Sequence, residues 1–257
     1  MRIDVWSDVV CPWCYIGKRR LEKALAAFDA AHPGADIEVV WRSFELDPSA
    51  PAVPIESVAE SLGRKYGGGV EAGRAMVERV GAVAAEEGMT WNHGSSLRVK
   101  TVTAHRLLHG ALHDGGLELQ SKLKQALFEA YFEKELNIAD EATLVDLADS
   151  VGFDRDRARE IITSSEFADE VEADIRQAAA LGATGVPFFV VDQKYGISGA
   201  QPVEFFTQVI ERAWDESHPA VTLVAPDSST DASDSSAGGT DSSAGEAGAC
   251  GPDGCAI

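Results

Sequence analysis

The chain has 257 residues, 45% of them hydrophobic, so it is long enough to bury a sizeable core. Its formal net charge of −20 argues against nucleic acids and anionic membranes as partners. No stretch approaches the ~18–20 consecutive apolar residues that span a bilayer. Only six of the 42 acidic residues lie in 217–257, so the whole chain is acidic. We interpret this acidity as adaptation to high salt, with a merely acidic soluble protein as the alternative.

The first residues give an expectation about the cellular compartment. MRIDVWSDVV has neither the basic segment nor the apolar segment of an export signal, so we expect a cytoplasmic protein. Paired cysteines in that reducing compartment are more often redox-active or metal-binding than structural.

The N-terminal part of the sequence predicts a β-α-β unit. Ile, Val and Trp indicate a short buried strand over 3–8. Pro12 opens a helix over 12–32, which ends at a Pro-Gly pair. A second strand is predicted over 36–46 and stops at Asp47-Pro48.

The middle of the chain, from about 55 to 182, has a helical pattern throughout. Glycines at 67–69, 115–116 and 152 separate several of the helices. The predicted helices are 55–66, 70–88, 100–114, 119–135, 140–152 and 154–182.

Strand character returns towards the end of the chain. VPFFVVD (186–192) and YGISGA (195–200) predict two strands, and a helix is predicted over 202–216. The order of elements indicates an α/β domain with an all-helical insertion. After Pro219 the sequence is rich in Ser, Gly, Asp and Ala, which predicts a disordered acidic tail.

The motif CPWC (11–14) lies where the first strand meets the first helix. A helix N-terminus favours negative charge, so we expect the Cys11 thiolate to be stabilised and to be the attacking sulfur. Pro12 suits the first turn, because its missing N–H would have no partner there. Trp13 limits solvent access, and Cys14 lies a turn deeper, where it can resolve a mixed disulfide. This placement favours a cycling dithiol, with a metal site and an inert pair as the alternatives.

Two stretches resemble the signature regions of the DsbA family of thioredoxin-fold proteins, in its FrnE-like branch: DVVCPWCYIGKRRLEKAL (8–25) and ATGVPFFVVDQKYGISGAQPVEFF (183–206). The helical middle is similar to that branch as well, so the resemblance covers about residues 1–216. It implies a thioredoxin fold with an inserted all-helical domain. The predicted parts are a first thioredoxin-fold segment (1–52), the helical insertion (53–182), a second thioredoxin-fold segment (183–218) and the flexible acidic tail (219–257).

The resemblance also implies that Val186-Pro187 is the family's cis-proline position, which faces CPWC. In that fold the bond turns the Val186 backbone outward, where it can pair with an extended substrate segment. Pro187 lacks an N–H and packs beside the sulfurs. A trans proline at the start of an edge strand is the alternative.

Further candidates surround the motif. Glu45, near the end of the second predicted strand, is a candidate proton acceptor for Cys14, with a solvated carboxylate as the alternative. Asp8 either influences the thiolate or simply ends the strand. His105, His109 and His113 recur every four residues, but no carboxylate or cysteine obviously completes a site with them, so we predict no metal.

These features predict a thiol–disulfide oxidoreductase or isomerase that acts through Cys11 and Cys14 on protein substrates or small thiols. No cofactor is expected beyond the redox-active disulfide, which could exchange with glutathione or another low-molecular-weight thiol. Monomer and dimer both stay open. One alternative is an isomerase or kappa-type glutathione transferase of the same superfamily, although those enzymes generally carry serine where Cys11 stands. The other is a zinc site that joins CPWC to a second cysteine pair.

That second pair is Cys250 and Cys255, in CGPDGC near the end of the predicted tail. Pro-Asp-Gly between them is a strong turn signal, so a small disulfide loop is sterically reasonable. A linker of about 30 residues has a reach of roughly 30 Å, which lets the pair visit CPWC. The resemblance adds that some FrnE-like proteins carry a C-terminal pair of this spacing that exchanges with the first. We hypothesise a relay between the two pairs, with a separate metal-binding or incidentally oxidised tail as the alternative.

Overall fold

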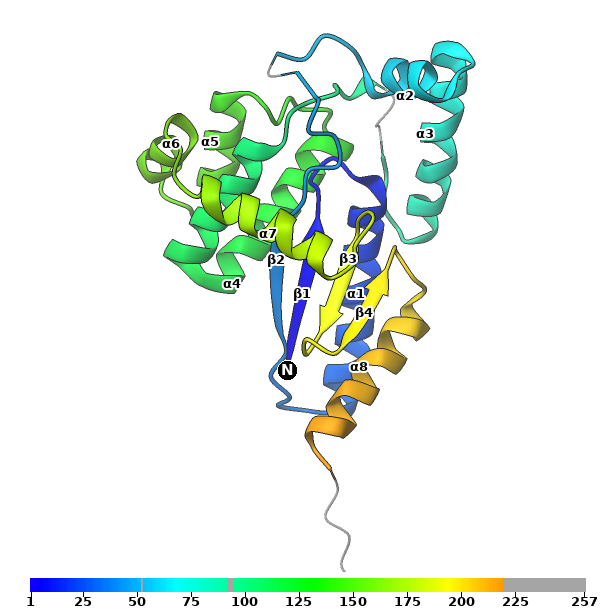
Figure 1. The fold of residues 1–257 in the computed structure, drawn as a ribbon, viewed down its shortest axis with the longest axis vertical. Helices are drawn as coiled ribbons and strands as arrows, with labels where there is room; N and C mark the ends of the chain where they lie inside the picture. Colours follow the sequence, from blue (N-terminus) through cyan, green and yellow to red (C-terminus); the bar gives the residue numbers. More distant parts are fainter. Residues whose placement is uncertain (52, 92–94, 220–257) are drawn as a thin grey trace, which may run out of the picture. The chain divides into compact units, whose positions relative to one another are not determined.

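Four strands form one sheet within residues 1–51, 53–91 and 95–219, the part of the chain that the computed structural model describes (Figure 1). The strands lie in the order β2-β1-β3-β4. β1 pairs in parallel with β2, whereas the β1–β3 and β3–β4 pairs are antiparallel. The predicted tail lies outside the described residues from residue 220 onward, and Cys250 and Cys255 lie there with it. The strands are β1 (Arg2–Ser7), β2 (Glu38–Ser43), β3 (Phe188–Val191) and β4 (Tyr195–Ser198).

One face of the sheet packs against two helices, α1 (Pro12–Ala31) and α8 (Val203–Ser217). The side chains of Ile3 and Val5 are fully buried on this face. Successive side chains of a strand point to opposite faces, so Trp6 of β1 faces the other way. Because apolar side chains of β1 point to both faces of the sheet, helices can pack against either face.

The other face of the sheet is covered by α7 (Ala168–Ala180). Trp6 packs there with Phe188 and Ala178, and its indole Nε1 donates a hydrogen bond to the Asp174 carbonyl at 2.8 Å. α7 belongs to the end of the segment predicted as a helical insertion, yet it supplies a layer of the sheet domain. Residues Met1–Pro219 form one compact unit.

The helices between β2 and β3 lie mainly beside the sheet. Figure 1 shows α4, α5 and α6 grouped next to the β2 edge, and α2 and α3 as a separate hairpin. The order β-α-β, helices, β-β-α confirms the predicted α/β class with a helical insertion. The helices that precede α7 in this segment are α2 (Val58–Tyr66), α3 (Gly69–Glu86), α4 (Val102–Phe132), α5 (Glu141–Ser150) and α6 (Arg155–Thr163).

α4 is longer than predicted, because it continues past the glycines that separate two expected helices. Gly116 adopts φ 71° and ψ −166° inside it, a conformation that glycine tolerates without steric cost. The chain bends at this residue. After the bend, α4 buries Leu127 and Phe128 in the same core cluster as Cys11 and Cys14. The helical block thus reaches the first turn of α1.

The prediction of one continuous helix over 154–182 is wrong. The structure breaks it into α6 and α7, and a buried arginine from α4 occupies the break. The Arg106 guanidinium donates hydrogen bonds to the Ile161 carbonyl and, at 2.6 Å, to the Glu166 carbonyl. Carbonyl groups at a helix end lack helical partners, so these bonds stabilise the interruption.

Candidate active site

Cys11 and Cys14 lie at the start of α1, as predicted. Cys11 is the N-cap residue, with an extended backbone at φ −85° and ψ 115°, and Pro12 occupies the first helical position. The Cys14 N–H donates to the Cys11 carbonyl at 3.0 Å, which closes the first turn. Both side chains are free thiols, and they are 3% and 1% exposed. The sulfurs are therefore withdrawn from bulk solvent.

The loop before β3 faces Cys11. The Val186-Pro187 bond is cis, as the resemblance implied. The Cys11 thiol donates to the Val186 carbonyl oxygen, with 3.5 Å between sulfur and oxygen. Gly17 of α1 permits this approach, because a Cβ at that position would lie only 3.1 Å from Pro187 Cγ. Two segments 175 residues apart in sequence therefore meet at Cys11.

An apolar pocket of about 320 Å³ opens beside Cys11. The first turn of α1 forms one side of it, and Val186 of the cis-proline loop contributes to the lining. Among the described residues, no Asp, Glu, Lys, Arg or His side chain lines it, so the pocket suits an uncharged, apolar group held next to the sulfur. The opposite wall comes from the α2–α3 hairpin and consists of Val58, Leu62, Tyr66, Met76, Val77 and Val80.

Lys124 of α4 lies in the protein interior, where the charges of Cys14 and Cys11 act on it. Its side chain is fully buried. The Nζ donates a hydrogen bond to the Ser7 carbonyl at 3.3 Å, and it lies 5.7 Å from the ring centroid of Trp41 and 5.0 Å from that of Phe128. The ionisable groups whose charges act on it are, in decreasing order, Cys14, Asp8, Cys11 and Lys18.

Burial dominates the protonation of Cys14 and Lys124. It raises the pKa of the Cys14 thiol well above its usual value, contact with Cys11 raises it further, and the Lys124 charge opposes both effects. Burial also lowers the pKa of Lys124 to about 8, because the ammonium loses its hydration, while negative charge on Cys14 and Asp8 opposes that change. An amine that titrates near neutral pH thus adjoins a thiol that ionises reluctantly.

Asp8 fixes the loop between β1 and α1. Its fully buried carboxylate accepts a hydrogen bond from the Leu46 N–H at 2.7 Å and lies 3.2 Å from the His105 Nε2. The Asp8 carbonyl accepts from the Cys11 N–H at 3.2 Å. In the described residues, the buried Nδ1 of His105 has no hydrogen-bond partner. Asp8 therefore ties α4 and the segment after β2 to the loop that carries Cys11.

Residues 2–211 match the family of DSBA-like thioredoxin domains. The chain belongs to this family. The predicted thioredoxin fold with a helical insertion is therefore confirmed.

Three known proteins are similar to this chain in sequence or in fold. SCO1869 of Streptomyces coelicolor, a probable DsbA oxidoreductase, is 41% identical with a TM-score of 0.77, and the match covers 100% of this chain and 99% of that chain. YwbO of Bacillus subtilis, an uncharacterized protein, is 28% identical over 82% of this chain and 96% of its own. DsbM of Pseudomonas aeruginosa, a cytosolic disulfide reductase solved with GSH, shares the fold at 14% identity and a TM-score of 0.59, over 83% of this chain and 99% of that chain.

The three histidines predicted on one helical face have separate partners in the DsbA-like fold. The His109 Nε2 lies 3.0 Å from the Ser43 hydroxyl, and this contact connects α4 to β2. In residues 1–51, 53–91 and 95–219, no three His, Cys, Asp or Glu side chains are grouped so that they could hold a metal ion. The carboxylates that face the histidines are Asp8 for His105 at 3.2 Å, Asp174 for His109 at 3.1 Å and Asp114 for His113 at 2.6 Å.

Lys124 was not among the site residues predicted from the sequence, and Glu45 was predicted as the proton acceptor instead. Glu45 is half-buried, its Oε1 has no hydrogen-bond partner in the described residues, and it is absent from the groups that act most strongly on Cys14. Its role as proton acceptor stays a prediction. The sequence pattern that could have indicated Lys124 is its place on an apolar stripe of the helix, because lysine is rarely found on a buried stripe. The stripe consists of Gln120, Leu123, Lys124, Leu127, Phe128 and Tyr131.

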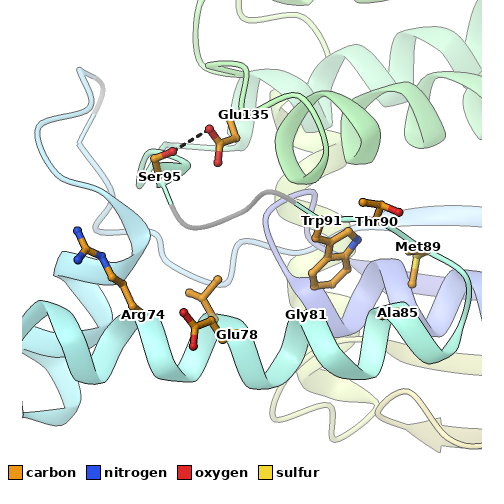
Figure 2. Close-up of a pocket in the computed structure, with 10 residues that line it drawn as sticks. Arg74, Glu78, Gly81, Ala85, Met89, Thr90, Trp91, Ser95 and Glu135 are labelled. Atoms are coloured by element: carbon orange, nitrogen blue, oxygen red, sulfur yellow. Dashed lines mark hydrogen bonds between the residues drawn. The ribbon is translucent and has the colours of Figure 1, made fainter.

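A larger pocket, of about 650 Å³, lies on α3, and neither Cys11 nor Cys14 lines it. Figure 2 shows Arg74 and Glu78 on this helix, Trp91 on the segment that follows the helix, and the Ser95–Glu135 hydrogen bond on the far side. Val77 lines both pockets, so they adjoin at α3. Among the described residues, every helix is too short or too polar to cross a bilayer.

Proposed function

We propose that this DsbA-like protein is a thiol–disulfide oxidoreductase in which Cys11 is the nucleophile and Cys14 the resolving cysteine. In the reductive direction, the Cys11 thiolate attacks a substrate disulfide, one substrate sulfur leaves as a thiolate, and a mixed disulfide forms. Cys14 then attacks the Cys11 sulfur, which releases the second substrate thiolate and leaves a Cys11–Cys14 disulfide. The oxidative direction reverses both steps, so two electrons move in either case.

The observation that carries this proposal is the different surroundings of the two thiols. Cys11 caps a helix N-terminus, lines the apolar pocket and faces the Val186 carbonyl. Cys14 lies one turn deeper and is absent from that lining. A helix N-terminus favours negative charge, which supports Cys11 as the attacking sulfur. The hidden Cys14 is suited to attack only after Cys11 has bound a substrate.

Polypeptide thiols and disulfides are the substrates that we propose. The pocket beside Cys11 accepts an apolar side chain, and the Val186 backbone can pair with an extended segment in the manner of an added strand. We also propose that a small thiol such as glutathione exchanges with the pair, since the fold relative DsbM was solved with GSH. The disulfide itself then serves as the redox group, without a further cofactor.

Insulin reduction with excess dithiothreitol tests the assignment of the cysteines. We expect turnover by the wild-type protein and its loss in Cys11→Ser. With insulin and no dithiothreitol, Cys14→Ser should accumulate a mixed disulfide between Cys11 and insulin, visible by mass spectrometry. Glutathione conjugation to an electrophile without insulin reduction would instead favour the transferase class. Zinc bound at one equivalent to the reduced protein would favour the four-cysteine site.

We further propose that Cys250 and Cys255 relay electrons to or from Cys11 and Cys14. The support is the sequence: a turn-forming CGPDGC and a linker long enough to reach CPWC. In Cys14→Ser, a mixed disulfide between Cys11 and a tail cysteine should then accumulate under mild oxidation. Recovery of tail disulfides alone would contradict the relay.

We also propose a cytoplasmic location and membership in the FrnE-like branch. The support is that the fold relative DsbM is a cytosolic disulfide reductase. Fractionation of cells that express the protein tests the location. Recovery in a secreted or periplasmic fraction would contradict it.

A further inference from the structure

We propose that Lys124 exchanges a proton with Cys14 during disulfide exchange, so that the helical insertion supplies the acid–base group of the cysteine pair. The neutral amine accepts the thiol proton when Cys14 attacks, and the ammonium returns it when Cys14 is the leaving group. This inference rests on the proposed function, because it assumes that Cys14 resolves a mixed disulfide at Cys11.

The placement of Lys124 supports this role. It comes from α4, and its Nζ donates a hydrogen bond at 3.3 Å to the carbonyl of Ser7, the last residue of β1 and four residues before Cys11. Cys14 is the first of the charged partners that act on it. Cys14, in turn, has no other cationic group among the main influences on its ionisation. Cys14 is thus the strongest charged influence on Lys124, and Lys124 is the cation that favours the Cys14 thiolate.

The surroundings of Lys124 do not explain it as a structural ion. In the described residues, the Ser7 carbonyl is the one hydrogen-bond acceptor of its Nζ. The Asp8 carboxylate acts on it through charge, but the Asp8 oxygens are bonded to the Leu46 N–H and His105. A buried ammonium without a directly bonded counter-ion is costly to keep. A lysine in such a site is well suited to lose its proton.

The proton transfer completes the chemistry of the second step. In the mixed disulfide, the Cys14 thiol gives its proton to the Lys124 amine, which leaves a thiolate beside an ammonium. The thiolate forms a bond to the Cys11 sulfur, and the substrate sulfur leaves with the electron pair of the broken disulfide. The proton stays on Lys124 until solvent removes it. In the oxidative direction, the ammonium stabilises the leaving Cys14 thiolate and then protonates it.

The other charged groups around Lys124 set the pH at which the exchange occurs. Asp8, from the loop before α1, favours the ammonium, and Lys18, from α1, disfavours it. Burial outweighs both, so the amine is partly neutral near physiological pH. A base is most effective when its pKa lies near the working pH. The buried lysine meets that condition, whereas a solvated lysine does not.

Stopped-flow reaction with 5,5′-dithiobis(2-nitrobenzoic acid) separates the two steps. Attack by Cys11 releases one thionitrobenzoate, and attack by Cys14 on the mixed disulfide releases a second. All variants are full-length and carry Cys250→Ser and Cys255→Ser, so only the CPWC thiols react. Lys124→Met removes the amine, and Lys124→Arg keeps a charge that does not release its proton. Lys122→Met, at an exposed position on the same helix, is the matched control.

We expect the wild-type second phase to rise with pH to a plateau, with a midpoint near 8. In Lys124→Met the second phase at pH 7 should slow by about 10²-fold and reach no plateau by about pH 9. Lys124→Arg should not restore it, and Lys122→Met should follow the wild type. The first phase should change by less than about threefold in every lysine variant.

Three results would overturn the inference: an unchanged second phase in Lys124→Met, its restoration by Lys124→Arg, or its loss in Glu45→Gln with Lys124→Met unaffected. If Lys124→Met does not fold, as judged by near-ultraviolet circular dichroism, a wild-type second phase without a midpoint near 8 is equally decisive. Failure of the proposed function looks different, because the single remaining thiol of Cys11→Ser, Cys14, would then release thionitrobenzoate as fast as the first phase of the wild type.

Discussion

Replacing Lys124 by methionine should make the folded protein more stable at neutral pH. The pKa of Lys124 falls from 10.5 to about 8, and a tenfold change in proton affinity corresponds to ~1.4 kcal/mol. Holding the ammonium in the folded state at pH 7 therefore costs roughly 3 kcal/mol relative to the unfolded chain. Methionine has a similar length and no charge, but it forfeits the contacts of the ammonium with Trp41 and Phe128, worth about 1 kcal/mol. The net gain should be about 2 kcal/mol.

The pH dependence gives this prediction its sign. Between pH 8 and 10.5 the unfolded chain keeps the lysine proton and the folded protein has lost it, so this lysine makes the wild-type unfolding free energy rise with pH. The advantage of Lys124→Met should therefore shrink across that window and vanish above it. Urea unfolding, followed by tryptophan fluorescence in the presence of a reductant at pH 7 to 10, measures both quantities. Lys122→Met should be neutral at every pH, because its side chain is exposed. A pH-independent loss of stability in Lys124→Met would refute the reasoning.

Three further predictions follow from packing and charge. Gly17→Ala should lower the free energy of unfolding in urea by about 1–3 kcal/mol and slow insulin reduction, because its Cβ would lie 3.1 Å from Pro187 Cγ. The control Gly81→Ala has open space around its Cβ and should be neutral or slightly stabilising. Asp174→Ala should lower the unfolding free energy by about 3 kcal/mol, because the buried carboxylate accepts a hydrogen bond from the Ser43 N–H at 2.8 Å and pairs with Arg42 and His109. The control Glu172→Ala, at an exposed position, should lower it by less than about 0.5 kcal/mol. The thermal unfolding midpoint should rise between 0.1 and 2 M salt, since screening relieves repulsion in a chain of net charge −20; no rise would contradict adaptation to high salt.

Local patterns predicted the frame of the fold but not every helix boundary. Periodicity and turn residues identified the strands and α1, because those segments bury one face against a neighbour in a regular register. The break between α6 and α7 depends on Arg106, which comes from about 60 residues away and takes two backbone carbonyls. The sequence pattern within 154–182 does not indicate that an arginine from another helix binds there. The packing of α7 on the sheet likewise depends on tertiary contacts, which the sequence of α7 alone does not determine.

The site was predictable where it is local or where a resemblance supplied the distant part. Cys11, Pro12 and Cys14 occupy the positions expected from the strand-to-helix junction. The cis bond at Val186-Pro187 came from the resemblance, since an X-Pro bond is cis in only ~5–6% of cases in folded proteins. Lys124 required the knowledge that α4 packs under CPWC. Its position on a buried stripe was visible, but the element that it faces was not.

The redox equilibrium of the CPWC pair with glutathione tests the central claim most directly. The full-length protein is equilibrated with a series of ratios of reduced to oxidised glutathione, quenched with acid and alkylated, and the state of each cysteine is read by peptide mass spectrometry. We predict that Cys11 and Cys14 pass together from two alkylated thiols to one intramolecular disulfide, in a single two-electron transition. Two thiols that stay reduced at every ratio, or that pair with other partners but not with each other, would contradict it.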